Sequence, residues 1–275
     1  MHRSHFKNDH YNSYYYANII DNILSGDIEL IGFISNFHDL YSTSIIKPFK
    51  KFSAFHSFIA HVIHEFFVEE MYEYDRKEFE AYLVDPPIRK LYAEDLLKNY
   101  ELEYSFLQFI GEKSKITWGN IEDYHEEITV TGYLEELVTK ISHEVFYLLF
   151  NNRELMMQFN TLMSKYHTSE IVITESEEDE VVKLFKKDGV LKRVYIPQWV
   201  KRAVFFRDRG HCCNCRKDIS SLVSLSEREQ YDHIVPLIKG GLNDISNIQL
   251  LCSNCNQKKG GQDIYTSKIY EKWYE

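Results

Sequence analysis

Two Cys-x-x-Cys pairs constrain the fold of this chain more than any other feature of its sequence. Cys212/Cys215 and Cys252/Cys255 stand 36 residues apart, and the first 211 residues contain no cysteine. Each pair can supply two thiolates from one tight turn, so two pairs complete the tetrahedral ligand set of a zinc ion. Cys213 is the spare cysteine, since it would give only Cys-x-Cys spacing with Cys215. Because four protein ligands leave no open position for a substrate, we predict a structural Zn²⁺ site.

The rest of the composition is typical of a globular protein. Hydrophobic residues make up 44% of the 275 residues and aromatic residues 15%, which excludes an intrinsically disordered chain. The N-terminal residues lack the apolar stretch of a signal peptide, and no apolar run approaches the roughly 18 residues of a membrane span. We therefore expect a cytoplasmic protein with no membrane partner, in which paired cysteines point to metal or redox chemistry before disulfides.

The net charge of −10 conceals two segments of opposite sign. Residues 181–275 carry 17 Lys and Arg against 10 Asp and Glu, whereas residues 1–180 carry 15 against 32. The basic segment has the sign expected of a phosphate binder, and the acidic segment has the opposite sign. Such asymmetry favours two functional units. We predict a helical domain over 1–170, an acidic linker with a β-hairpin over 171–195, and a second domain over 196–275.

Apolar spacing predicts that residues 1–170 are mostly helical. Apolar side chains recur there at the three- and four-residue intervals of amphipathic helices. Helices are expected over 18–35, 52–71, 88–97 and 134–163. The hairpin is predicted by Asp188-Gly189, which separates two short apolar runs. Pro197 and Gly210 bracket one more short helix, expected over 198–208.

The residues between and after the cysteine pairs carry the chemistry. Asp232-His233 lies in a short segment bounded by proline, which predicts a strand, and residues 248–251 predict a second strand. Gly240-Gly241 lies in the loop between them, and residues 253–259 can form a short helix. This strand–loop–strand–helix unit is too small to hold itself together by hydrophobic burial alone. A zinc staple is therefore expected to stabilise it.

Residues 207–261 resemble the HNH endonuclease family in its zinc-containing ββα-metal form. The matching features are Arg-Asp-Arg-Gly at 207–210, the segment 232–236, the Gly-Gly loop, Asn247, Leu-Leu-Cys, and Cys-Asn-x-x-Lys. The resemblance implies an α+β fold class, with a mostly α-helical N-terminal domain followed by a small zinc-stapled HNH domain. It also implies a metal-dependent endonuclease that hydrolyses the phosphodiester bonds of nucleic acid, with DNA as the expected substrate.

Family roles are carried over onto matching positions only. By resemblance, His233 is the general base that activates the attacking water, and Asn247 holds the first strand and orients His233. Asp232 fills the position of a carboxylate ligand to the catalytic cation. Asn256 stands where the family usually has histidine, as in an HNN subgroup, and its amide oxygen can still ligate a hard cation. A neutral oxygen in place of imidazole favours Mg²⁺ or Mn²⁺ over softer metals.

Three lysines flank these residues and are candidates for nucleic-acid binding, with an ordinary surface lysine as the alternative for each. They are Lys239, Lys258 and Lys259. The alternative to an active nuclease is a catalytically inactive, zinc-stabilised module that binds nucleic acid or a protein partner. The intact Asp232, His233, Asn247 and Asn256 favour activity, since a decayed site usually loses its base or its metal ligand first.

Residues 1–170 resemble no family, and we expect a regulatory or partner-binding role for them. The partner is another protein or a second copy of this chain. The acidic charge of this segment suggests that it restrains the basic nuclease surface by competing with phosphates. The family resemblance leaves the pathway open among mobile elements, restriction and antiviral defence.

Overall fold

The chain divides into two compact units. The computed structural model describes residues 11–26, 32–88, 90–111, 115–170, 179–220 and 229–268. One unit comprises residues 1–18 with 59–145, and the other comprises residues 19–58 with 146–275. The predicted division into 1–170, 171–195 and 196–275 stays a prediction about roles, because compactness groups residues by contact rather than by function.

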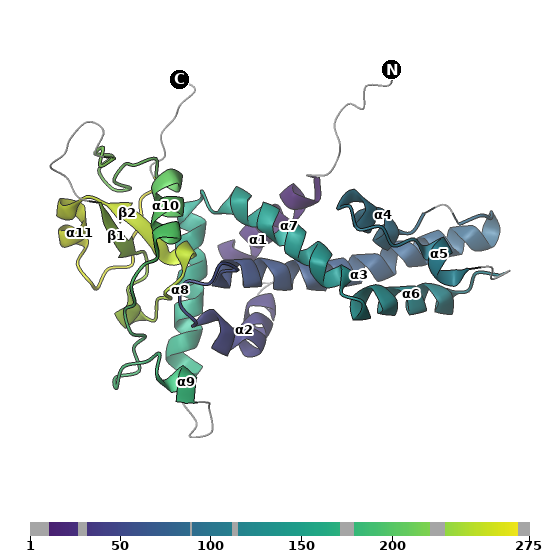
Figure 1. The fold of residues 1–275 in the computed structure, drawn as a ribbon, viewed down its shortest axis with the longest axis horizontal. Coiled ribbons are helices and arrows are strands. Elements are labelled where there is room, and N and C mark those ends of the chain that lie inside the picture. The colour runs from purple at the N-terminus through teal and green to yellow at the C-terminus, as the bar shows by residue number, and fades with distance from the viewer. Residues whose placement is uncertain are drawn as a thin grey trace, which may run out of the picture. The chain divides into compact units, whose positions relative to one another are not determined.

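The first unit is helical (Figure 1). It takes its residues from α1 (Tyr11–Ser25), α3 (Ala54–Val84), α4 (Tyr92–Asn99), α5 (Phe106–Ile110), α6 (Trp118–Val130) and α7 (Tyr133–Leu149). The boundaries between the units fall inside α1, α3 and α7, so each of these helices contributes residues to both. A buried hydrogen bond between His125 Nε2 and Asp75 Oδ2, at 2.8 Å, links α3 to α6. None of the described helices is both long enough and apolar enough to cross a membrane.

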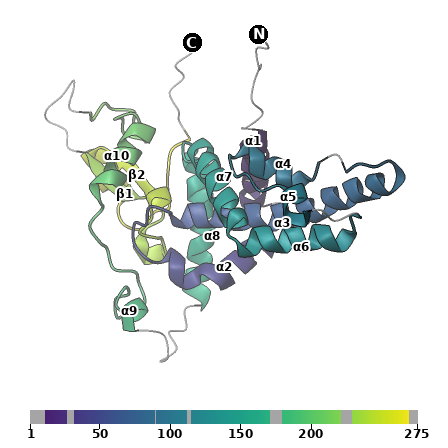
Figure 2. The same cartoon turned by 45° about the vertical axis from the view of Figure 1, so that its right-hand side comes forward.

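The second unit combines helices with the small sheet. Its remaining elements are α2 (Gly32–Ile45), α8 (Arg153–Glu170), α9 (Asp179–Val182), α10 (Gln198–Arg207), β1 (Gln230–His233), η3 (Leu237–Lys239), η4 (Ile245–Asn247), β2 (Ile248–Leu251) and α11 (Ser253–Lys259). Strands β1 and β2 are antiparallel, with Asp232 opposite Gln249 and His233 opposite Ile248. Figures 1 and 2 show α10 beside β2. The predicted α+β class, with helices first and a small strand–strand–helix unit near the C-terminus, is confirmed.

The helix bounds differ from the sequence-based expectations at identifiable residues. The stretch over 134–163 forms two helices, because Asn152 ends the run between α7 and α8 and its side-chain Oδ1 accepts a hydrogen bond from the Leu155 N–H at 3.2 Å. The helix expected over 18–35 begins earlier, as α1, and ends before Gly26, whose φ of 93° suits glycine. Residues 27–31 lie outside the described part of the chain.

The predicted hairpin is present in a shortened form. Phe185 and Leu191 form an antiparallel bridge. The N–H of Lys186 donates to the Val190 carbonyl, and the N–H of Lys192 donates to the Leu184 carbonyl, each at 2.8 Å. The first arm of the hairpin, expected over residues 181–185, starts later because residues 179–182 are helical, as α9. Most of the predicted acidic linker, residues 171–178, lies outside the described residues.

Segments from the first half of the chain help to build the unit that contains the sheet. Asp244, which precedes η4, is buried and accepts hydrogen bonds from the N–H groups of Ala54 and Ser246 at 2.8 and 2.9 Å. Asp244 therefore caps the first turn of α3. Asn160 of α8 donates to the Ser246 hydroxyl at 3.0 Å. The loop between the two strands is thus anchored on α3 and α8.

Candidate active site

The four cysteines of the two Cys-x-x-Cys pairs come together in the structure. The Sγ atoms of Cys212, Cys215, Cys252 and Cys255 all lie within 4.8 Å of one another. Cys252 precedes α11, and its Sγ accepts a hydrogen bond from the Cys255 N–H at 3.4 Å. Four sulfur ligands at this spacing fit the tetrahedral geometry that zinc adopts in structural sites. The cluster can therefore hold a zinc ion between the turn at 212–215 and the end of β2.

Cys213 lies outside this cluster. Its side chain is fully buried, and its backbone N–H donates to the Leu250 carbonyl at 2.9 Å. Burial, and after it the neighbouring charge of Asp208, raises the pKa of the Cys213 thiol to about 12. The structure therefore places Cys213 as a core residue that joins the turn to β2.

Asp232 and His233 stand at the end of β1 and line one cleft of about 320 Å³. Three further segments complete its wall. They are the hairpin through Lys186, Asp188, Val190 and Arg193, the loop at 236–238, and residues 260–262 after α11. Two carboxylates, an imidazole and two cationic side chains therefore border the same cavity. This combination suits a negatively charged substrate that reacts with water.

A hydrogen-bonded chain fixes the orientation of His233. The Asn243 Nδ2 donates to the Lys192 carbonyl at 2.9 Å, so the amide oxygen of Asn243 faces His233, where Oδ1 lies 3.3 Å from Nε2. An amide oxygen only accepts hydrogen bonds, so Nε2 of His233 carries the proton. The other nitrogen, Nδ1, is buried and has no hydrogen-bond partner among the described residues. Its lone pair is therefore not engaged by any described residue.

His233 is 2% exposed, and this burial affects its charge. Desolvation and, after it, the positive charge of Arg193 lower the pKa of the imidazole to about 4. The negative charge of Asp232 acts in the opposite direction and is outweighed. The imidazole is consequently neutral at neutral pH.

Lys259 holds the Asp232 carboxylate. Its Nζ lies 2.8 Å from Asp232 Oδ2 and donates to the His233 carbonyl oxygen, also at 2.8 Å. The Lys259 side chain is 3% exposed, although the sequence suggested a surface lysine in contact with phosphate. Lys259 follows Cys255 by four residues, so both lie on the face of α11 that packs inward. Gln249, opposite Asp232 on β2, also donates to Oδ2, at 3.5 Å.

Asn247 holds the loop that follows His233. It is fully buried, accepts a hydrogen bond from the Val235 N–H at 2.8 Å, and donates to the carbonyls of Val235 and Leu242 at 2.9 Å each. Gly241 makes this clamp possible: a Cβ there would lie 1.9 Å from the Val235 carbonyl oxygen and 2.9 Å from Asn247 Nδ2. Asn247 therefore acts on the backbone after His233, whereas the imidazole itself donates its hydrogen bond to Asn243.

The remaining predicted residues lie on or near α11. Asn256 is half-buried on α11, and within the described part of the chain its side chain has no hydrogen bond. The contact from α11 to Asp232 is made by Lys259, three residues further along. Lys239 and Lys258 are exposed and line a second cleft, of about 610 Å³, on this domain. They are placed where a phosphate could reach them.

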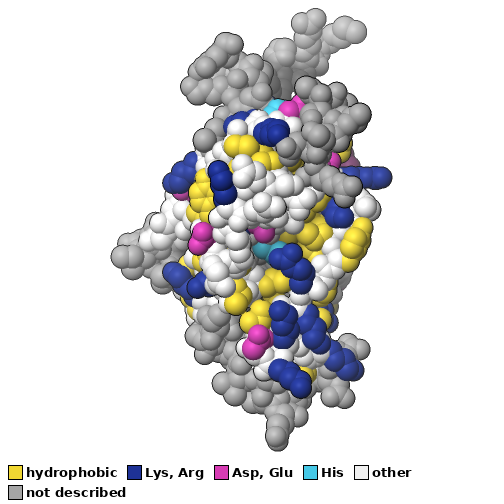
Figure 3. All heavy atoms as spheres, turned by 90° about the vertical axis from the view of Figure 1, so that its left-hand side faces the viewer, with side chains coloured by type: hydrophobic (Ala, Val, Ile, Leu, Met, Phe, Trp, Pro, Cys, Tyr) yellow, Lys and Arg dark blue, Asp and Glu magenta, His cyan; other side chains and the backbone are white. Residues whose placement is uncertain are grey.

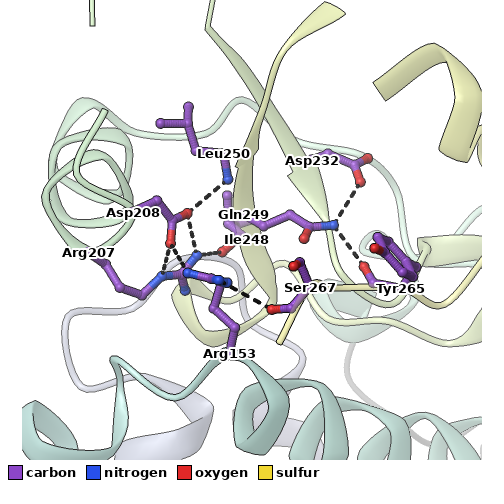
Figure 4. A network of polar contacts seen from close by, with 9 residues as sticks. All are labelled: Arg153, Arg207, Asp208, Asp232, Ile248, Gln249, Leu250, Tyr265 and Ser267. Atoms are coloured by element: carbon purple, nitrogen blue, oxygen red, sulfur yellow. Dashed lines mark hydrogen bonds and ion pairs between the residues drawn. The ribbon is translucent and has the colours of Figure 1, made fainter. Parts of the chain in front are cut away.

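A buried ionic cluster supports the sheet from the side of α8 (Figure 4). Asp208 accepts two hydrogen bonds from Arg207 at 2.9 Å each and lies 3.4 Å from Arg153 Nη1. Its second role is to accept a hydrogen bond from the Leu250 N–H of β2, at 3.0 Å. Although burial opposes it, the two guanidiniums hold the pKa of Asp208 below its usual value. The Arg-Asp-Arg-Gly motif pointed to this aspartate, but nothing in the sequence pointed to Arg153.

Comparison with known proteins agrees with this geometry. Residues 212–262 match the family model described as HNH endonuclease. No curated protein and no solved structure was found to match the chain. The matched segment contains the four clustered cysteines and Asp232, His233, Asn247 and Asn256. Helix α8 and the hairpin that borders the cleft both lie before it.

Proposed function

Residues 212–262 form an HNH endonuclease domain, and from this premise we propose that the chain hydrolyses phosphodiester bonds of nucleic acid, with DNA as the expected substrate. The observation that carries the proposal is the cleft shared by Asp232 and His233 at the end of β1. The four-cysteine cluster supports it, because a structural zinc would hold the small domain together. The expected role in restriction or antiviral defence is a prediction about pathway.

His233 is the proposed general base, through its Nδ1 atom. The Lys192–Asn243–His233 chain leaves Nδ1 as the nitrogen without a proton. A water that enters from the cleft and reaches Nδ1 can give up its proton there as its oxygen attacks phosphorus. Asn247 contributes by fixing the backbone at Val235, two residues after the base. Asn243 thus positions the imidazole, and Asn247 positions the backbone that follows it.

Asp232 and Asn256 are the proposed ligands of a catalytic Mg²⁺ or Mn²⁺. Lys259 occupies Oδ2 of Asp232, and the other carboxylate oxygen has no hydrogen bond to any described residue, so it fits a hard cation. A divalent cation held there would supply the Lewis acid that stabilises charge on the phosphate. Lys259 keeps the carboxylate in place beside the base, and the exposed Lys239 and Lys258 are proposed to contact phosphates.

The proposal is tested by incubating the purified full-length protein with plasmid, linear duplex, single-stranded DNA and RNA. Each substrate is tested without added divalent metal and with Mg²⁺ or Mn²⁺. We expect metal-dependent cleavage that His233→Ala reduces by at least the ~10²–10⁴-fold that a general base contributes. His64→Ala, which removes an exposed histidine of α3, serves as the control and should cleave normally. A folded, zinc-loaded His233→Ala protein that cleaves at the parent rate would refute the assignment.

The second candidate function is a zinc-stabilised binding module without catalysis. The contact between Lys259 and Asp232 favours this candidate, because the ammonium group neutralises the carboxylate that is proposed to bind the metal. Under this alternative the protein binds nucleic acid but does not cleave it with either metal. The same incubations, followed by a binding measurement, separate the two functions.

A further inference from the structure

The hairpin at residues 183–193 is placed to contact whatever enters the catalytic cleft. Two of its cationic residues, Lys186 and Arg193, line the cleft together with Asp232 and His233. The hairpin precedes the segment that matches the HNH family, so the family assigns it no role. We propose that it is a binding arm for the phosphate backbone of a polynucleotide, with Lys186 and Arg193 contacting phosphates next to the bond that is cut. This inference rests on the proposed nuclease function.

The fold of the hairpin exposes its charged residues and buries its apolar ones. Phe185 and Leu191, which form the antiparallel bridge, are 7% and 5% exposed. Lys186 follows Phe185 on the turn side of this pair, Arg193 lies two residues after Leu191, and both side chains are exposed. The buried pair anchors the hairpin in its own unit. The backbone that carries the cationic side chains is therefore held in place. A pre-organised backbone lowers the entropic cost of binding a ligand.

The charge of the hairpin is strongly positive. Its basic residues are Lys183, Lys186, Lys187, Lys192 and Arg193, against a single acidic residue, Asp188. Lys192 donates to the Lys183 carbonyl within the hairpin. In the described part of the chain, Lys186, Lys187 and Arg193 have no ion-pair partner. Exposed cations in excess beside a cleft create a positive potential that attracts a polyanion. Figure 3 shows Lys and Arg side chains gathered on this face, below the histidine in the middle of the view.

The hairpin is also joined to the catalytic histidine. The Lys192 carbonyl accepts the hydrogen bond that orients Asn243, and Asn243 in turn bonds His233. A phosphate backbone bound by Lys186 and Arg193 would therefore be bound by the same segment that positions His233, the proposed general base. The hairpin would thus fix the phosphates of the bound strand relative to the imidazole. In-line attack requires such a fixed position.

The test compares two variants that lose the same charge from different places. Lys186→Ala/Arg193→Ala removes two cations from the cleft, and Lys98→Ala/Lys115→Ala removes two exposed cations from the other compact unit. Both are made in full-length protein that carries His233→Ala, so that the probe stays intact. Binding to a labelled duplex DNA, single-stranded DNA and RNA of one sequence is measured over a range of salt concentrations, and thermal melting checks the fold.

We expect the hairpin variant to bind more weakly and to show a shallower dependence of log affinity on log salt. On a duplex the slope should fall by about 0.9 for each lost phosphate contact, and on a single strand by about 0.7. The control variant should keep the parent slope. If the alanine pair lowers the melting temperature, Lys186→Gln/Arg193→Gln, which keeps side-chain length, takes its place.

Each result decides between the possibilities. An unchanged slope in the hairpin variant, or an equal loss in the control, overturns the binding arm while leaving the nuclease proposal standing. A parent protein that binds none of the three polynucleotides at low salt overturns the proposed function and the arm together. The probe whose slope changes most identifies which polynucleotide the arm contacts.

Discussion

At the scale of single residues, the motif predicts which groups react but not which groups position them. Asp232, His233 and Asn247 are candidates through their resemblance to the HNH family, and the structure places the first two in one cleft. Asn243 could not be identified in this way, because it is one polar residue of a loop ten positions after His233. Its role depends on how the loop folds against Lys192. Lys259 is buried because it lies four residues after Cys255 on the inward face of α11, and its role in nucleic-acid binding stays a prediction.

The first prediction at this scale concerns Asn243. Asn243→Ala removes the acceptor for His233 Nε2–H and frees the imidazole to adopt either tautomer. We expect kcat to fall by roughly 10-fold or more, within the ~10²–10⁴-fold contribution of a general base. KM should stay unchanged, since the Asn243 side chain is buried and does not line the cleft. Steady-state kinetics on the preferred substrate separates the two parameters.

The matched control for Asn243 is a loop residue of the same burial whose hydrogen bonds avoid His233. Ser246→Ala removes a hydroxyl that bonds Asp244 and Asn160 in the same loop. It should lower the melting temperature with little effect on kcat of the folded protein. A fall in kcat of the same size in both variants would mean that Asn243 only stabilises the loop.

At the scale of elements, the local signals near the C-terminus were reliable. Pro197 and Gly210 predicted the bounds of α10 to within one residue. The expected strand at 248–251 and the expected helix at 253–259 coincide with β2 and α11. The long apolar stretch over 134–163 was misjudged because the same periodicity continues across the break at Asn152. Periodicity records which face is buried, whereas a break between two helices depends on a cap.

The prediction for these elements is that a single zinc ion joins the turn at 212–215 to α11. Cys212→Ser, Cys215→Ser, Cys252→Ser and Cys255→Ser should each lose the zinc and unfold the domain, because zinc contributes ~10–16 kcal/mol to folding in small zinc-binding peptides. Cys213→Ser should keep its zinc, since the serine hydroxyl can donate to Asp208 as the buried thiol does. Elemental analysis and hydrogen exchange measure the two effects. A zinc-free parent, or a Cys213→Ser protein without zinc, would contradict this ligand set.

At the scale of the whole molecule, the boundary suggested by charge does not coincide with the compact units. The acidic and basic segments meet near residue 180, yet residues 19–58 and 146–170 belong to the unit that contains the sheet. Arg153 is 55 residues from Asp208, and no spacing rule connects them. Contacts of this kind depend on tertiary packing and cannot be derived from local patterns. The regulatory role of residues 1–170 therefore stays a prediction, and part of that segment has a structural role.

This structural role leads to the last prediction. A fragment of residues 181–275 contains the family match but lacks Arg153 and Asn160, which bond Asp208 and Ser246. A fragment of residues 146–275 keeps both partners, and the two fragments lack the other compact unit equally.

A net hydrogen bond contributes ~0.5–1.5 kcal/mol, and in a domain of this size 1 kcal/mol shifts the melting temperature by ~4–8 °C. With α8 removed as well, the shorter fragment should melt roughly 10 °C or more below the longer one. Hydrogen exchange at the Leu250 amide, which donates to Asp208, should be faster in the shorter fragment when both are saturated with zinc. Equal melting temperatures and equal protection would show that the HNH segment folds independently of α8, as the charge boundary alone had suggested.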